Sequence, residues 1–379
     1  MLNPGILLSS TIALLMLGST LGNDISSPNN PCLSSYSCQY TALENGFNSS
    51  EDTTMIKEPL LGIYYGNQGW RMDQVQALEA WQGKKYAVLN LFTNWANDPK
   101  VIDNLFQQQL PNIWNNQNIP MISWEPYTIG TTPNDIEVQI ANGEHDSYIH
   151  HWADQLKAFL SGPDGQYGTA DDRRVYLRLA HEMNGDWYPW GATMGNNSPN
   201  DYIRMWRHTK AIFDSKGLDS SRLQWVWSVN HRDIGRYKAE EFYPGDSYVD
   251  WVSIDGYNWG ASQSWSSWQT PAEVFDNMIN RLHKITDKPI AITEVGTTSL
   301  VSPKQNDLAR KSAWITDFRN YVVNRDIKMV IWFNEDKETD WAVFGGIRGD
   351  GNFKRDRTTY KAYSTYKADV IKVSADEHQ

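Results

Sequence analysis

The sequence has few cysteines, few positive charges and no long hydrophobic run. Two cysteines among 379 residues are too few for a disulfide scaffold or a cysteine-rich metal site, and no Cys-x-x-Cys spacing occurs. The 34 Lys and Arg are outnumbered by 45 Asp and Glu, which gives a formal net charge of −11. Because nucleic acids and anionic membranes are bound largely through Lys and Arg, we expect neither as a partner.

Two common enzyme signatures are also missing. No Gly-x-Ser-x-Gly motif occurs, which argues against the usual α/β-hydrolase nucleophile. His145, His150 and His151 do not have the spacing of a zinc site, and residues 162–172 lack the ligand spacing of an EF-hand. The sequence therefore predicts no metal site and no cofactor.

Tryptophan is the residue that the sequence has in excess. There are 18 Trp residues, and aromatic residues make up 13% of the chain. Indole rings bury large apolar areas and also stack on flat ligands. So many of them on an acidic protein indicate either an unusually aromatic core or a surface that binds something flat and uncharged.

The N-terminal segment resembles a secretion signal. Ile6–Leu17 is an apolar run followed by small residues, so residues 1–22 are predicted to be a signal peptide of a secreted protein. The run is too short to span a bilayer comfortably. No Lys or Arg precedes Lys57, so the usual cationic start is reduced to the α-amino group.

Residues 23–58 are polar and rich in Ser, Asn and Thr, which predicts a flexible linker. Cys32 and Cys38 lie in this segment. They could form a short-loop disulfide in an oxidising compartment or remain two free thiols.

From residue 59 onward, short apolar runs alternate with longer amphipathic segments, a pattern typical of βα units around a parallel sheet. Strands are expected at Leu60–Tyr65, Tyr86–Leu91, Pro120–Trp124, Val175–Leu179, Leu223–Ser228, Val249–Ile254, Pro289–Ile292 and Met329–Phe333. Helices are expected at Asp73–Gln82, Ile102–Gln117, Ser147–Leu160, Pro199–Lys216, Pro271–Ile285, Asn306–Asn324 and Arg357–Val370, with a weak signal at Arg236–Phe242.

Eight such units predict an α/β protein with a single (β/α)₈ TIM barrel over residues 59–372, followed by a tail at 373–379. A doubly wound open sheet is the alternative fold. No Gly-rich phosphate loop follows the first predicted strand, which disfavours it.

Two glutamates stand where predicted strands open into loops. Glu182 follows the fourth strand and Glu294 follows the seventh, and these strands lie across the mouth of a (β/α)₈ barrel from each other. Either glutamate alone could be a salt-bridged structural group. Together, beside several aromatic residues, they match the two carboxyl groups that glycosidic bond cleavage requires.

The segment from Arg178 to Trp190, Arg-Leu-Ala-His-Glu-Met-Asn-Gly-Asp-Trp-Tyr-Pro-Trp, resembles the acid/base signature of glycoside hydrolase family 26. This is a retaining (β/α)₈ family of endo-acting β-glycanases, known mainly as β-1,4-mannanases. Further similar segments lie at 226–228, 248–257, 293–296 and 332–341, in the family's order. The resemblance covers about residues 59–370.

The resemblance implies that Glu182 is the general acid/base and Glu294 the nucleophile of a double displacement. It places His181 near the nucleophile, Trp187 in the substrate cleft, Tyr257 against the nucleophile, and Trp332 beneath the sugar as a hydrophobic floor. We also expect substrate contacts from Trp190 and Asp255, the latter as a hydroxyl ligand together with Asn258. An ordinary loop cap is the alternative for these two polar residues.

The resemblance implies an endo-β-glycosidase that hydrolyses a neutral plant-type β-glycan, most simply β-1,4-mannan. The N-terminal segment predicts that this enzyme is secreted, and we expect it to be a monomer. Tyr188-Pro189-Trp190 and Val229 depart from the mannanase pattern, so a β-1,3-1,4-glucan is the alternative substrate. A non-catalytic carbohydrate-binding barrel is a second class of function. Trp259, Trp265 and Trp268 either line outer sugar subsites or pin a loop to the barrel.

Overall fold

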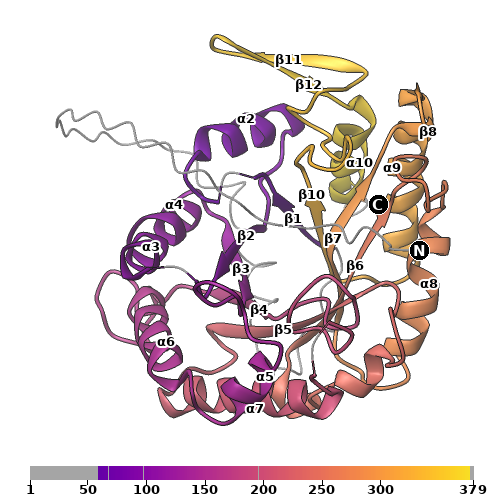
Figure 1. Cartoon of the computed structure of the whole chain (residues 1–379). Coiled ribbons are helices and arrows are strands. Elements are labelled where there is room, and N and C mark those ends of the chain that lie inside the picture. Colours follow the sequence, from indigo (N-terminus) through magenta and orange to yellow (C-terminus); the bar gives the residue numbers. More distant parts are fainter. Residues whose placement is uncertain (1–58, 67, 97, 195, 376–379) are drawn as a thin grey trace.

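The computed structural model describes residues 59–66, 68–96, 98–194 and 196–375, with side chains as far as residue 369. Eight parallel strands close into a barrel, and helices surround it (Figure 1). The strands are β1 (Leu60–Tyr64), β2 (Val88–Asn94), β3 (Ile119–Glu125), β4 (Val175–Leu179), β5 (Leu223–Asn230), β6 (Trp251–Asn258), β7 (Ile290–Thr297) and β10 (Met329–Phe333). Each pairs with its neighbour in chain order, and β10 closes the barrel on β1. The predicted (β/α)₈ barrel is confirmed.

The helices of the outer ring are α2 (Met72–Gln82), α3 (Pro99–Asn104), α4 (Leu110–Asn115), α5 (Ile136–Ala141), α6 (Asp146–Leu160), α7 (Pro199–Ser215), α8 (Pro271–Leu282), α9 (Leu308–Asn324) and α10 (Ser364–Ala375). Three of them begin with Pro after a capping residue, because proline needs no hydrogen-bond acceptor at the first helical position. The side chains of Asp98, Ser198 and Thr270 accept the backbone N–H three residues later.

Two expected helices differ in detail. The helix expected over 102–117 starts at Pro99 and contains a π-helical turn, Leu105–Gln109, just before Pro111. Pro111 has no N–H to donate to the preceding turn, and a wider turn accommodates it. The weak signal near 236–242 corresponds to a 3₁₀ turn, Ala239–Phe242.

The helix expected over 357–370 is wrong in its first half. Gly351–Arg355 (β11) and Thr358–Ala362 (β12) form an antiparallel hairpin, and α10 begins only at Ser364. Asp356, with φ of 53°, makes the turn between the two strands. The β-branched and aromatic residues of β12 favour a strand over a helix. A second small hairpin, β8 (Leu300–Ser302) with β9 (Gln305–Asn306), was not predicted.

Side chains inside the barrel form layers because successive residues of a strand point to opposite faces. The lowest layers are apolar, with residues from all eight strands: Leu60, Val88, Ile119, Met121, Tyr176, Val226, Trp251, Ala291, Met329 and Ile331. Two residues further along six strands, every inward side chain is polar and buried: Asn90, Ser123, Arg178, Ser228, Ser253 and Thr293. The interior therefore changes from apolar to polar toward the C-terminal ends of the strands.

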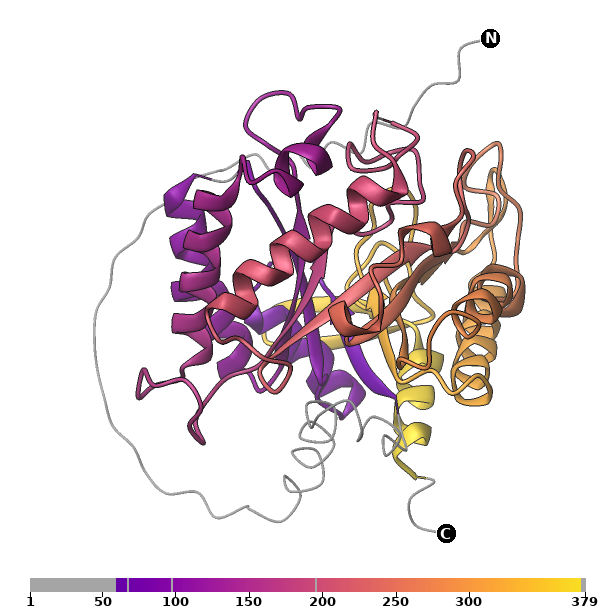
Figure 2. The ribbon, with the colours of Figure 1, turned by 90° about the horizontal axis from the view of Figure 1, so that it is seen from below.

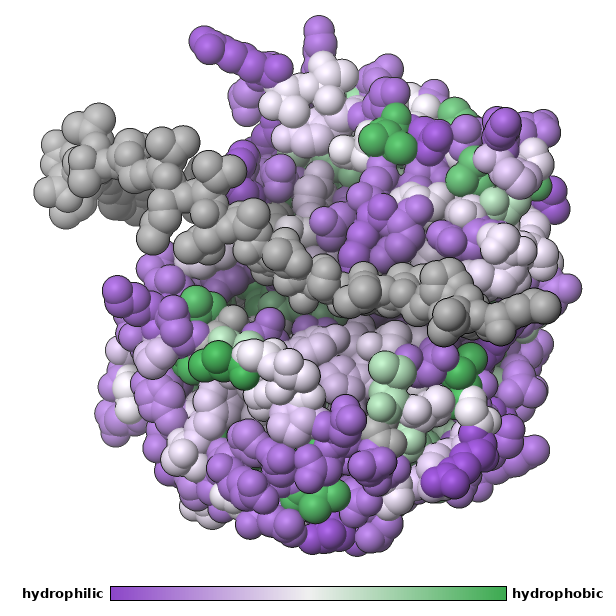
Figure 3. Space-filling model, viewed as in Figure 1, coloured by the Kyte–Doolittle hydropathy of each residue, from purple (hydrophilic) through white to green (hydrophobic). Residues whose placement is uncertain are grey.

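The loops after the strands build the opposite end of the molecule. In Figure 2 the segment that carries α5, between β3 and α6, stands above one end of the barrel. The face shown in Figure 3 is largely hydrophilic, with hydrophobic residues scattered over it. Among the described residues no helix is long and apolar enough to cross a membrane.

The predicted signal peptide, the linker and both cysteines lie outside the described residues. α10 continues to Ala375, past the expected end of the barrel domain at 372.

Gly62 is required by the narrow barrel interior. It lies one layer above Leu60, and a Cβ added there would come within 2.8 Å of Ile331 Cγ1 and 3.0 Å of the Val88 carbonyl oxygen. We expect Gly62→Val to lower the free energy of unfolding by about 1–3 kcal/mol through overpacking, measured by urea denaturation. Gly351→Ala, at the start of the outer hairpin, is the matched control and should leave stability close to that of the wild type. Equal stability of the Gly62→Val protein would contradict this account of the interior.

Candidate active site

Arg178, the polar-layer residue of β4, is fully buried and connects three strands. Its Nη1 donates to Asp255 Oδ2 at 2.8 Å, its Nη2 to Glu294 Oε1 at 2.5 Å, and its Nε to Ser123 Oγ at 2.8 Å. A buried guanidinium with carboxylate partners on two neighbouring strands fixes the position of both acids. The site is therefore built around a cation that belongs to the barrel core.

β7 contains one extra residue at Glu294. Ile292 pairs with Ile254 on one side and with Val330 on the other, but the next pairs are Glu294 with Asp255 and Val295 with Trp332. Such a bulge turns two consecutive side chains to the same face. Thr293 accordingly bonds to Ser253 and Asp255 in the polar layer, while Glu294 also points inward and reaches Arg178.

Glu294 has partners on both carboxylate oxygens. Tyr257 donates its hydroxyl to Oε2 at 2.6 Å, and Arg178 holds Oε1. His181 Nε2 lies 3.8 Å from Oε1, beyond hydrogen-bond distance, and instead lies 3.1 Å from the Tyr188 hydroxyl. Burial and the nearby Arg178 keep the pKa of His181 well below its usual value, so this imidazole is neutral at neutral pH.

Glu182 lies in the loop directly after β4, in a strained backbone. Ala180 has a φ of 44° and Glu182 a φ of 55°, a region that costs about 1–2 kcal/mol for each L-residue. The Glu182 N–H donates to the Ser228 carbonyl oxygen at 2.9 Å, and Trp187 Nε1 donates to Glu182 Oε2 at 2.8 Å. These hydrogen bonds hold Glu182 in its strained conformation at the barrel mouth, and such strain is common at functional sites.

Two residues of the same loop set its shape. A Cβ at Gly185 would lie 2.5 Å from the Trp187 ring, so only glycine lets the indole approach Glu182. Asn184 accepts a hydrogen bond from the Asn230 N–H at 2.8 Å and donates to the Asn230 carbonyl oxygen at 3.0 Å. This pair ties the loop to the end of β5, a role that the sequence reasoning missed.

Glu182 and Glu294 lie in different electrostatic environments. Burial, followed by the negative charges of Asp255 and Glu294, raises the pKa of Glu182 well above its usual value, and the Trp187 N–H and Arg178 oppose this only in part. Glu182 therefore keeps its proton, while Glu294 is fixed between Arg178 and Tyr257. One carboxylic acid that can donate a proton beside one oriented carboxylate is the arrangement that acid-assisted nucleophilic substitution requires.

Trp190 is a correction to the expected substrate contacts. The indole is fully buried, stacks on Tyr188 with 4.4 Å between ring centroids, and donates Nε1 to the His181 carbonyl oxygen at 2.7 Å. It therefore supports the loop from beneath and has no surface left for a ligand. Trp187, by contrast, is partly exposed, in keeping with a place in the cleft.

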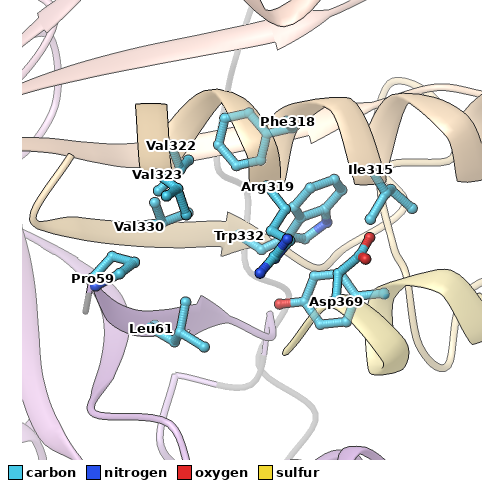
Figure 4. A pocket seen from close by; sticks show the side chains of 12 residues that line it. Pro59, Leu61, Ile315, Phe318, Arg319, Val322, Val323, Val330, Trp332 and Asp369 are labelled. Carbon is cyan, nitrogen blue, oxygen red and sulfur yellow. The ribbon is translucent and has the colours of Figure 1, made fainter. Parts of the chain in front are cut away.

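Trp332 is also placed differently from the expectation. It points outward from β10 toward α9 and α10, with its ring 6.2 Å from Phe318 and 5.5 Å from Tyr366. Figure 4 shows it lining a small cavity of about 60 Å³ beside Phe318 and Val330, on the helix side of the strand. Because strand side chains alternate, the inward neighbour Phe333 faces the barrel mouth instead.

A different aromatic group lies on the inner side of the barrel. Phe333, Tyr64 and Trp341 pack together on the inner side, and the Tyr257 ring lies 5.9 Å from Phe333 and 4.9 Å from Trp341. Tyr257 thus joins this group to Glu294. Trp341 follows β10 in a loop, and the sequence offered no periodic signal that would have favoured it over Trp332.

Asp255 and Asn258 are buried and already occupied. Asp255 accepts hydrogen bonds from Arg178, Ser228 and Thr293, and burial raises its pKa to about 7. Asn258 accepts the backbone N–H groups of Gly260 and Gln269. Asp255 is therefore a support beneath Glu294, and Asn258 is the loop cap that was the alternative; neither is an open hydroxyl ligand.

Glu125 was missed by the sequence reasoning. It is the last residue of β3, it is buried, and burial raises its pKa to about 8 against the opposing effect of Arg178. The negative charge of Glu294 adds to the rise. Met121, Ser123 and Glu125 alternate inward along β3, so extending the predicted strand by one residue would have found it.

The three tryptophans of the β6–α8 loop have different surroundings. Arg310 lies over the Trp268 ring at 4.5 Å, which makes Trp268 a staple between the loop and α9. Trp259 lies 4.8 Å from Trp341 and 5.4 Å from Trp265, and Trp265 is 58% exposed. Aromatic rings therefore extend from Tyr257 outward to solvent.

Within the described ranges, no three His, Cys, Asp or Glu side chains are grouped so that they could hold a metal ion.

The model of glycosyl hydrolase family 26 matches residues 62–335. This chain belongs to glycosyl hydrolase family 26. Endoglucanase H of Acetivibrio thermocellus is 35% identical over 289 residues, which are 75% of this chain and 28% of that protein. A mannan endo-1,4-β-mannosidase of Bacillus subtilis strain 168 is 32% identical over 213 residues, 53% of each chain.

The match with this family 26 chain spans 28% of the length of the endoglucanase and 53% of the length of the mannosidase. Among solved structures, the catalytic domain of an endo-β-1,4-mannanase from Bacillus sp. JAMB-750 superposes with a TM-score of 0.57 and 19% identity. The match covers 89% of this chain and 90% of that one, and it shows a shared fold.

Arg178 provides a test of the buried charge cluster in this family 26 barrel. Arg178→Met leaves Asp255 and Glu294 buried without their cation, so we expect about 3–5 kcal/mol less stability at pH 8. Arg178 lowers the pKa of Asp255, so the pKa of Asp255 should rise when Arg178 is removed. A carboxyl group whose pKa is raised by folding contributes stability that is lost as pH rises through that pKa. The loss should therefore be smaller at pH 5 than at pH 8 in urea unfolding.

Arg204→Met is the matched control, because Arg204 forms an exposed pair with Asp201 at 3.6 Å. It should cost at most about 1 kcal/mol at either pH. If the Arg178→Met protein does not fold, the same unfolding measurements can be made on Arg178→Lys, which keeps the positive charge. A loss that does not depend on pH would contradict the electrostatic explanation.

Proposed function

We propose that this chain is a secreted, monomeric endo-β-glycosidase that hydrolyses a neutral β-linked polysaccharide with retention of anomeric configuration. The observation that carries the proposal is the pair of a proton-holding Glu182 and an oriented Glu294 at the mouth of a family 26 barrel. The apolar run at residues 6–17 supports secretion.

In the first step the Glu294 carboxylate attacks the anomeric carbon while Glu182 gives its proton to the leaving oxygen. The glycosidic bond breaks and a glycosyl ester of Glu294 forms. In the second step Glu182, now ionised, takes a proton from a water molecule whose oxygen attacks the anomeric carbon. Glu294 leaves as a carboxylate, and Glu182 is again protonated.

The electrostatics of the site favour this exchange of roles. The negative charge of Glu294 is one of the causes of the raised pKa of Glu182. Esterification removes that charge, so the pKa of Glu182 falls when it must become a base. Arg178 and Tyr257 keep Glu294 in place and stabilise the carboxylate as it leaves.

Two backbone sugars are candidates. β-1,4-Mannan, implied by the sequence resemblance, is the substrate named for the Bacillus subtilis relative and for the solved Bacillus structure. A β-glucan is the second candidate, because the endoglucanase matches with higher identity over more of the chain. Tyr188-Pro189-Trp190 and Val229 depart from the mannanase pattern and so do not favour mannan.

A panel of galactomannan, glucomannan, mixed-linkage β-glucan and β-1,3-xylan separates these candidates. We expect the kcat/KM, measured by reducing-sugar release, to be highest on a mannan or on the mixed-linkage glucan. Products should be a range of oligosaccharides, as internal cleavage requires. Release of monosaccharide alone would contradict endo action, and binding without release would indicate a non-catalytic barrel.

Glu182 and Glu294 are tested by substitution. Glu294→Gln should lower kcat on the preferred polysaccharide by at least about 10⁴-fold, because no glycosyl ester can form. Glu182→Gln should lower it by about 10²–10⁴-fold. Glu144→Gln, in an exposed loop, is the control and should keep full activity. Full activity of the Glu294→Gln protein would disprove the mechanism.

The acid/base role has its own signature. With a dinitrophenyl glycoside, whose leaving group needs no proton, the Glu182→Gln protein should release one equivalent quickly and then stall. Azide should restore turnover by attacking the anomeric carbon and displacing Glu294, giving a β-glycosyl azide. A structural role for Glu182 predicts no such rescue, and an α-product would contradict retention.

Trp187 should tune the pH profile. Its N–H stabilises ionised Glu182 and so lowers the pKa of that carboxyl group. Trp187→Phe removes the donor, so the pKa rises and activity should persist to higher pH before the protonated acid is lost. We expect the alkaline limb of kcat/KM against pH to move upward while the acidic limb stays in place. A downward shift of the alkaline limb would contradict the assignment.

A further inference from the structure

A hollow on the outer side of the barrel, between α2 and α4, is not part of the site described above. Its volume is about 300 Å³. These helices are neighbours in the ring of Figure 1, and Trp70 lies in the loop between β1 and α2. The lining residues are Trp70, Met72, Gln76, Asn112, Asn115 and Asn116. They combine one indole with four side-chain amides and include no charged residue.

Trp70 is exposed although its backbone is held firmly. The indole is 47% exposed. Gln109 Nε2 donates to the carbonyl oxygen of Gln68 at 2.5 Å, and Asn112 Nδ2 donates to that of Gly69 at 3.1 Å. Gly69 has a φ of 80°, and a Cβ there would meet the Gln109 carbonyl oxygen at 3.0 Å. The turn thus seats against α4 and presents a large apolar ring to solvent.

The amides around Trp70 have hydrogen-bonding capacity to spare. Asn115 is exposed, and its side chain makes no hydrogen bond to another described residue. Asn112 uses its Nδ2 on Gly69, and Gln76 uses its Nε2 on Asn116 Oδ1, so each keeps its amide oxygen as an acceptor. Near the hollow, Arg71 Nη2 lies 2.9 Å from Asp73 Oδ2, Lys85 Nζ lies 2.7 Å from Glu79 Oε2, and Arg355 Nη1 donates to the Gln76 carbonyl oxygen at 2.6 Å.

An exposed indole face beside uncharged donors and acceptors suits one class of ligand. The C–H face of a pyranose stacks on an aromatic ring, and its hydroxyl groups pair with amides. An anion would find no cation in the lining, and an apolar ligand would leave the amides unpaired. We propose that this hollow is a second binding site for neutral β-linked polysaccharide, which holds the polymer on the flank of the barrel. The choice of polymer rests on the proposed function.

Affinity electrophoresis tests the site in gels that contain either galactomannan or mixed-linkage β-glucan. The Glu294→Gln protein is the background, so that the polymer is not degraded. We expect Trp70→Ala to weaken retardation by about fivefold in apparent Kd, equivalent to about 1 kcal/mol of stacking. Trp70→Phe should keep most of the retardation, and Asn115→Ala should lose part of it. Val323→Ala, an exposed apolar residue of α9, is the control.

In the otherwise wild-type enzyme, Trp70→Ala should leave kcat/KM on a soluble tetrasaccharide unchanged and raise the KM on long polymer. Unchanged retardation of the Trp70→Ala protein in both gels would overturn the proposal, whether or not the chain hydrolyses polysaccharide. If retardation depends on Trp70 but the protein has no hydrolytic activity, the second binding site is supported and only the proposed function is refuted. Equal loss in Trp70→Ala and Val323→Ala would also overturn the second binding site.

Discussion

The buried guanidinium of Arg178 is the constraint on which the rest of the site depends. It is one full positive charge, and it faces Asp255 and Glu294 directly, with Glu182 and Glu125 close enough to feel it. Lys337 also acts on Glu125, but Arg178 is the cation that Asp255, Glu294 and Glu182 share, and one cation does not offset the burial of three carboxylates. The neutral imidazole of His181 adds no second positive charge. The shortage of positive charge is thus what makes an acid available beside a carboxylate.

The barrel beneath explains why such a charge can be buried at all. The apolar layers fill the base, and the polar layer above them supplies hydroxyl groups at the height of the guanidinium, among them Ser123 and, through Asp255, Ser228 and Thr293. Hydrogen-bonded networks of this kind must be complete, because an unpaired buried polar atom is costly. The site is therefore a continuation of the core and not an addition to its surface.

Much of the fold and the position of both glutamates could be predicted from the sequence, because apolar runs, strand ends and the spacing of βα units are local signals. The direction in which a side chain points cannot be predicted from such local signals. Trp332 and Phe333 are adjacent and both aromatic, and only the register of β10 decides which of them faces inward. Trp190 lies in the motif next to partly exposed Trp187, yet its burial depends on a stack with Tyr188 that no periodicity reveals. The hairpin β11–β12 interrupts a segment with helix-like spacing.

The extra residue in β7 limits which mutations the site can tolerate. Beyond Glu294 the inward face is resumed by Gly296, whose missing side chain leaves room for Tyr257 and Trp341. The placement of Glu294, Gly296 and the rings around them therefore depends on the number of residues in the strand as well as on their identity. A deletion of one residue here would rotate the whole end of β7, and no single replacement elsewhere could restore it. The position of the Glu294 carboxylate thus depends on the length of β7, and a substitution does not change that length.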